Sequence, residues 1–207
     1  MITGKEILSL ILALIVLAFS NAFINIGRFI NSLFIFAIIL IFYITAKKLT
    51  AYYYESEEET KIWTFQRYGL YKKSYFKSPV PVGVILPFLL SVLTFGYIPW
   101  FAVTMSDVNP TEARTAKRHQ IYSFSEMTEW HIALISASGI LGVLVLAPVA
   151  YILNFPDLAK ISVLFACFNM LPLGKLDGTR IFFGSIVLWV VLATISLIAL
   201  SYALLLV

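Results

Sequence analysis

Near the end of a long apolar segment, the chain reads Asn169-Met170-Leu171-Pro172-Leu173-Gly174-Lys175-Leu176-Asp177-Gly178. This decapeptide places an ionisable Asp at the mouth of a membrane span, where such residues usually face a protein interior or a water-filled cavity. Its Asn, Pro and two glycines interrupt the helix, and non-helical backbone at membrane depth is tolerated only where protein or a cavity satisfies it. We therefore expect the decapeptide to line a functional pocket.

The composition of the whole chain indicates a membrane protein. Of its 207 residues 60% are hydrophobic, and the mean hydropathy is +0.91. Several apolar runs reach the roughly 18–20 residues that span a bilayer, and they do not alternate as barrel strands do. The single cysteine, Cys167, excludes an intrachain disulfide and a cysteine zinc cluster. The net charge of +4 suits anionic headgroups, and no basic block is dense enough for nucleic acid.

Five apolar runs predict clear membrane crossings. The first is longer than the roughly 7–15-residue core of a cleaved signal peptide, so we interpret it as an uncleaved span. The second ends at Lys47 and Lys48, whose side chains can reach the membrane surface. The five runs are residues 7–25, 29–46, 131–153, 158–173 and 181–207.

The polar stretch after the second span predicts surface structure. The acidic cluster Glu55, Glu57, Glu58 and Glu59 reads as a solvated face. Aromatic-rich segments on either side of Gly69 are typical of a short hairpin at the membrane surface. Further on, the stretch from Asn109 to Glu112 favours the start of a short interfacial helix, with Pro at its first position.

Residues 79–105 are apolar but contain four prolines and two glycines, at Pro79, Pro81, Gly83, Pro87, Gly96 and Pro99. So many helix breakers favour a re-entrant or interfacial segment over a spanning helix. A segment that does not cross leaves most cations on one face and only Arg28 and Lys160 opposite, in keeping with the positive-inside tendency. We therefore predict that this segment turns back.

Together these patterns predict an all-α polytopic protein of the cell membrane. We expect five to six transmembrane helices, a re-entrant or interfacial segment and a small surface β-hairpin. Residues 1–207 would form a single integral membrane domain, in which residues 47–130 are the insert between the core spans.

The decapeptide also resembles a known signature. Asn169, Pro172, Leu176, Asp177 and Gly178 stand at the spacing Asn-x-x-Pro-x-x-x-Leu-Asp-Gly, which is that of the site-2 protease family of intramembrane zinc metalloproteases. The resemblance implies a site-2-protease-like core, with Asp177 at the position of the third zinc ligand. A weaker likeness extends over roughly residues 29–185 and includes a sheet-forming insert near Trp63 and the small-residue run from Ile135 to Ile140.

The residues that would bind zinc depart from that family. A zinc hydrolase needs two imidazoles, usually as His-Glu-x-x-His on one helical face, and the chain contains no such motif. The stretch Ala46-Lys47-Lys48-Leu49-Thr50-Ala51 resembles what surrounds the motif in the family. This alignment puts Tyr43 and Lys47 at the ligand positions and Ile44 at the position of the general base. Tyr43 cannot replace a zinc-binding histidine, and Ile44 cannot act as a general base. The Lys47 ammonium would repel a metal.

We therefore predict a metal-free site, with zinc as the alternative. An Asp177 without zinc needs a partner, and Lys47 is the natural one, with Lys48 or Lys175 as surface alternatives. A second interpretation is that Asp177 caps the helix that begins near Gly178.

These residues bear on four possible functions. The first is an inactive family member that binds a transmembrane helix of a client or of an active relative. The second is an active metalloprotease that combines Asp177 with His131 or His119. A serine protease of the rhomboid type would need a histidine after Ser136-Ala137-Ser138-Gly139 in a later span, and none follows His131. A transporter would usually show repeated halves, which are absent from the sequence.

Overall fold

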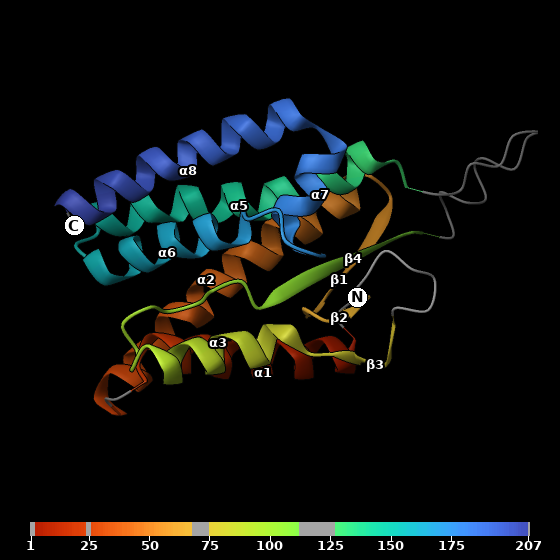
Figure 1. Ribbon diagram of the computed structural model, residues 1–207. Coiled ribbons are helices and arrows are strands. Elements are labelled where there is room, and N and C mark those ends of the chain that lie inside the picture. The colour runs from red at the N-terminus through yellow and green to blue at the C-terminus, as the bar shows by residue number, and fades with distance from the viewer. Residues whose placement is uncertain (1–2, 24–25, 68–74, 112–126, 207) are drawn as a thin grey trace, which may run out of the picture.

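The computed structural model describes residues 3–23, 26–67, 75–111 and 127–206, and it is mostly helical (Figure 1). Within these ranges, four helices are long and apolar enough to cross a membrane. They are α1 (Gly4–Asn21), α2 (Ile26–Tyr53), α5 (Glu129–Ile152) and α8 (Ile186–Leu206). The predicted membrane class is therefore supported, with one long helix fewer than the five runs predicted.

The missing span is α6 (Pro156–Asn169), which has 14 residues. At 1.5 Å per residue it is only about 21 Å long, short of the roughly 30 Å hydrocarbon core. The chain turns before this helix: Asn154 has φ 61°, and Pro156 occupies the first turn of the helix. The predicted last span also differs, because a separate helix α7 (Asp177–Gly184) precedes α8 and the extended Ser185 divides them.

The α2 helix runs further than the sequence predicts. It continues to Tyr53, so Lys47 and Lys48 lie inside the helix rather than at its end. In Figure 1 its last turns reach the small sheets, and α5 and α6 lie between it and α8. This extension is what carries Lys47 into the interior of the protein.

The segment at 79–105 leaves the sheets and comes back to them. It leaves the sheets as the helix α3 (Val82–Leu93), which lies along α1, and it returns to them as extended chain (Figure 1). The two ends of this segment form backbone hydrogen bonds with the same residue, Trp63. The Gly83 amide donates to the Trp63 carbonyl over 2.9 Å, and the Trp63 amide donates to the Val103 carbonyl over 2.8 Å. The reversal that the helix breakers predict is therefore confirmed.

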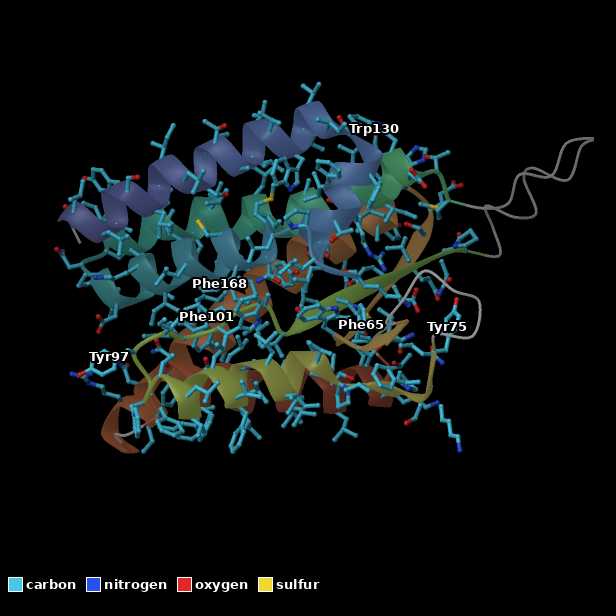
Figure 2. All side chains as sticks on the ribbon, viewed as in Figure 1. Phe65, Tyr75, Tyr97, Phe101, Trp130 and Phe168 are labelled. Atoms are coloured by element: carbon cyan, nitrogen blue, oxygen red, sulfur yellow. The ribbon has the colours of Figure 1, made fainter. Side chains whose placement is uncertain are left out.

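The returning chain passes through the core. Phe101 is fully buried, and its ring packs against Phe36 of α2 and Phe168 of α6, with ring centroids 5.1 and 5.6 Å apart (Figure 2). Large aromatic surfaces buried in this way contribute much of a core's packing energy. The extended chain thus holds α2 and α6 in place on either side of the site described below.

Two small antiparallel sheets accompany the helices in the described residues, where the sequence predicts one β-hairpin. The strand β2 (Phe65–Arg67) pairs with β3 (Tyr75–Val80), which confirms the strands of the predicted hairpin, while Gly69 lies outside the described residues. The strand β1 (Ser56–Ile62) pairs with β4 (Thr104–Pro110), in the register Ser56↔Pro110. The sequence does not predict this second sheet.

The β4 strand contradicts the predicted interfacial helix where it can be compared. Asn109 and Pro110 belong to the end of β4, and the stretch from Glu112 lies outside the described residues. Pro110 is tolerated because it is the last residue of the strand, where a missing amide donor breaks no interior ladder bond.

Part of the acidic cluster is also buried, contrary to the prediction of a solvated face. Side chains alternate across β1, and this alternation turns Glu58 inward, where 5% of it is exposed. Lys48 lies 2.7 Å from the buried Glu6 of α1 and 3.9 Å from Glu58. Lys48 is therefore not the surface lysine that the sequence predicts, because it pairs with these two buried carboxylates. The ion pairs hold β1 against α1 and α2.

Candidate functional site

Asp177 is the first residue of α7, and its side chain is fully buried. The residue at the helix cap is Leu176, and no side chain forms a capping hydrogen bond there. The interpretation of Asp177 as a helix cap is therefore wrong. Its carboxylate instead points toward α2.

The partner of Asp177 is Lys47. The Lys47 Nζ lies 2.5 Å from Asp177 Oδ2, and neither side chain has exposed surface. The Tyr43 hydroxyl, one helical turn earlier on α2, donates to the same carboxylate oxygen. The predicted pairing is thus present, and Lys175, the other alternative, is exposed. Residues four apart share one helical face, which is why Tyr43 and Lys47 reach the carboxylate together.

Ser106 of β4 completes the cluster. Its hydroxyl accepts from Lys47 Nζ over 2.6 Å and donates to Asp177 Oδ1 over 3.3 Å. Lys47 Nζ also donates to the Tyr43 hydroxyl over 2.7 Å. All three ammonium protons and both carboxylate oxygens therefore have partners, which is the condition under which a buried ion pair is tolerated. We call Tyr43, Lys47, Ser106 and Asp177 the polar cluster.

Sequence reasoning missed Ser106 because it did not predict β4. One signal was available. Thr104, Ser106 and Val108 are buried and alternate with more exposed residues, as in a strand with one face toward the core. The stretch is only seven residues long and contains polar side chains, so the alternation is weak beside the helical patterns.

A stripe of small residues on α5 closes the cluster from one side. A Cβ on Gly139 would lie 2.7 Å from Lys47 Cε and 3.0 Å from Tyr43 Cδ2. A Cβ on Gly142 would lie 2.9 Å from Ala46 Cβ, and the Ser138 hydroxyl donates to the Ala46 carbonyl over 3.2 Å. These small residues therefore let α5 approach α2 closely.

Replacing Gly139 with alanine should therefore destabilise the protein by about 1–3 kcal/mol, because the methyl group overlaps side chains that cannot move aside. The unfolding free energy in detergent micelles measures the effect. Gly4→Ala is the matched control, since nothing lies within 4 Å of a Cβ at that position. Equal stability of the two variants would contradict the tight packing over Lys47.

The remaining decapeptide residues build the wall of the cluster. The Asn169 side-chain amide donates to the Phe165 carbonyl over 2.9 Å, and Asn169 is fully buried. A Cβ on Gly178 would lie 2.2 Å from the Met170 carbonyl oxygen, so only glycine fits there. Leu176 is fully buried, whereas Pro172 is exposed. Asn169, Leu176 and Asp177 have no exposed surface, so the part of the decapeptide nearest the cluster lines a closed site.

The donor set around Asp177 does not suit zinc. Structural and catalytic zinc sites use thiolates, imidazoles and carboxylates, and here a single carboxylate faces an ammonium and two hydroxyls. Across the described ranges, no three His, Cys, Asp or Glu side chains are grouped to hold a metal ion. Ile44, at the position of the general base, lies in the apolar core with 9% of its surface exposed.

His131 does not add a ligand to the polar cluster. His131 lies in the first turn of α5, where its backbone amide donates to the Thr128 side chain and its ring packs on Tyr54 at 4.8 Å. His119 lies outside the described residues. Within the described part of the chain, no hydrogen bond between His131 and the polar cluster is present.

Family models, curated proteins and solved structures give no match to this chain. The arrangement around Asp177 must therefore be interpreted from its own chemistry. The buried, fully paired lysine and aspartate and the two hydroxyls lie between α2, α5, α7 and β4. It offers no open coordination position and no exposed nucleophile.

Proposed function

We propose that this chain is a multi-pass membrane protein of the site-2 protease type that has lost zinc chemistry and acts by binding transmembrane helices. The observation that carries the proposal is the 2.5 Å contact between the fully buried side chains of Lys47 and Asp177. The positive charge that a metal would supply to the carboxylate comes from Lys47 instead.

The positions of the cluster residues support the kinship. Tyr43 and Lys47 are four residues apart on α2, which is the spacing of the two histidines in His-Glu-x-x-His. Both contact the aspartate of the Leu-Asp-Gly sequence, as zinc ligands on the same metal would approach one another.

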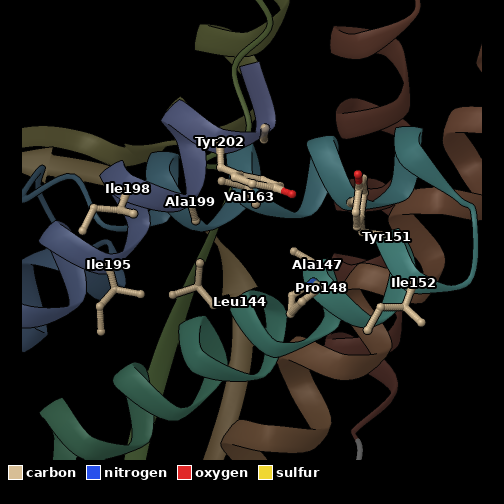
Figure 3. Close-up of a pocket in the computed structure, with 12 residues that line it drawn as sticks. Leu144, Ala147, Pro148, Tyr151, Ile152, Val163, Ile195, Ile198, Ala199 and Tyr202 are labelled. Carbon is tan, nitrogen blue, oxygen red and sulfur yellow. The ribbon is translucent and has the colours of Figure 1, made fainter. Parts of the chain in front are cut away.

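An apolar cavity of about 610 Å³ supports the binding role (Figure 3). It lies among α5, α6 and α8, and alanines from all three helices line it: Ala147, Ala159, Ala199 and Ala203. Small side chains allow helix backbones to approach closely within a membrane, where packing rather than hydrophobic transfer drives association. A transmembrane helix of a client or of an active relative is the occupant that this lining suits.

The metal content of the purified protein tests the loss of zinc chemistry. We expect far less than one zinc per chain, and we expect Asp177→Ala to leave that amount unchanged, because the carboxylate is already neutralised by Lys47. Elemental analysis by mass spectrometry after purification without chelator gives the ratio. Stoichiometric zinc that Asp177→Ala removes would favour the alternative, an active metalloprotease with rearranged ligands.

Photo-crosslinking tests the binding of a helix. A photoreactive residue at Ile198, which lines the cavity and is 65% exposed, should form an adduct with a membrane protein. Filling the cavity with Ala147→Phe and Ala203→Phe should abolish that adduct, because both alanines line it. The matched control is the same photoreactive residue at Leu89 of α3, on a different helix. Adducts with lipid alone at Ile198 would contradict the proposal.

A further inference from the structure

A second cavity lies at the other end of α2. It has a volume of about 400 Å³ and lies between the end of α1, the start of α2 and the start of α6. Arg28, on its rim, is 19 residues before Lys47, or about 28 Å along the helix axis. The cavity is therefore separate from the polar cluster, and nothing in the proposed function uses it.

The charges of this cavity are unusual for their location. Arg28 and Lys160 both line it, and in the described ranges they are the only cations at this end of the helices. The other described lysines and arginines lie at the start of α1, late in α2, on the strands or near α7. No carboxylate of the described part lies within ion-pair distance of Arg28 or Lys160. Two cations thus share one cavity with a single carboxylate, Asp157, which forms an ion pair with neither of them.

Neutral polar groups and apolar side chains complete the lining. The Asn21 amide donates to the Ser32 hydroxyl over 2.8 Å, which fixes the corner between α1 and α2. Asn31 adds a further exposed amide. Deeper in the cavity, the buried Ile35 and Ile161 give it an apolar wall. A ligand with an anionic, hydrogen-bonding head and an apolar continuation is complementary to this lining.

We propose that this cavity binds the phosphodiester headgroup of a membrane phospholipid. Arg28 and Lys160 supply charge-assisted hydrogen bonds to the phosphate oxygens, as basic pockets between transmembrane helices do for lipid headgroups. Asp157 on the same lining repels additional negative charge. A phosphodiester carries one negative charge, whereas free phosphate is partly dianionic at neutral pH, so the lipid is the better ligand.

Native mass spectrometry of the full chain in detergent tests the site, with short-chain phosphatidylglycerol as the probe. We expect one tightly bound lipid, and an affinity at least about tenfold lower in the double variant Arg28→Gln/Lys160→Gln, because two charged contacts are lost. The matched control is Lys5→Gln/Lys77→Gln, which removes the same charge from exposed positions elsewhere. That control should bind the lipid as the unmodified protein does.

Competition by inorganic phosphate separates the two sources of a phosphate group. We expect phosphate to displace the lipid only at much higher concentration, and Asp157→Asn to make phosphate a better competitor. Displacement at equal concentrations would assign the cavity to a soluble anion and overturn the lipid proposal. Unchanged affinity in Arg28→Gln/Lys160→Gln, or an equal loss in the control pair, would overturn it as well.

Discussion

Lys47→Met should reduce the stability of the folded protein by about 3–5 kcal/mol, because it leaves the Asp177 carboxylate buried without a cation. Methionine fills much of the same volume, so the loss reports the charge rather than a cavity. Asp177 would keep only the hydroxyls of Tyr43 and Ser106 as partners. The unfolding free energy measured in mixed micelles of mild detergent and dodecyl sulfate gives the value.

Two further variants make this expectation specific to the buried pair. Lys61→Met removes a lysine whose pKa is raised by hydrogen bonds to Asp107 and Glu59 but which is 39% exposed. Exposed ion pairs contribute about 0–1 kcal/mol, so this control should be nearly neutral. The double variant Lys47→Met/Asp177→Leu should recover most of the stability, because an apolar pair can replace a buried ion pair. A Lys47→Met variant as stable as Lys61→Met would contradict the account.

The sequence predicts the parts of this fold that depend on long helical patterns and on helix breakers. The continuous apolar runs predict α1, α2, α5 and α8, and the prolines of residues 79–105 predict the reversal after α3. The partner of Asp177 was also predictable, because a buried carboxylate needs a cation and Lys47 occupied the aligned position. Each of these features depends on residues close in sequence or on one strong chemical requirement.

The rest depends on contacts that are distant in sequence. Pairing of β1 with β4 joins Ser56 to Pro110 across the α3 excursion, and no local pattern in either strand specifies that partner. Ser106 enters the polar cluster only through this pairing, and Glu58 is buried only because β1 has an inner face. The helix α7 was merged with the last span because Ser185, which separates them, is a single residue in an apolar stretch.

Introducing the His-Glu-x-x-His motif into α2 should give this chain a zinc site. The triple variant Tyr43→His/Ile44→Glu/Lys47→His creates His-Glu-x-x-His on the face of α2 that contacts Asp177. Two imidazoles and a carboxylate would then converge, which is the ligand set of a catalytic zinc site. We expect about one zinc per chain, and thermal stability that rises with zinc by about 4 kcal/mol at a thousand times the dissociation constant.

The controls test whether zinc binding requires Asp177 or only the two introduced imidazoles. Adding Asp177→Ala to the triple variant should lower zinc affinity strongly, because one of three ligands is lost. The shifted motif Phe42→His/Tyr43→Glu/Ala46→His places the same residues one position earlier, which rotates them by about 100° around the helix axis. Phe42 is 49% exposed, whereas Tyr43 is fully buried. The shifted motif should bind zinc only weakly, since i, i+4 imidazoles would then lack the carboxylate. Equal zinc binding by the shifted motif, or binding that survives Asp177→Ala, would mean that this aspartate does not occupy a former ligand position. The proposed kinship with the zinc proteases would then lose its main support, whereas the buried ion pair would remain.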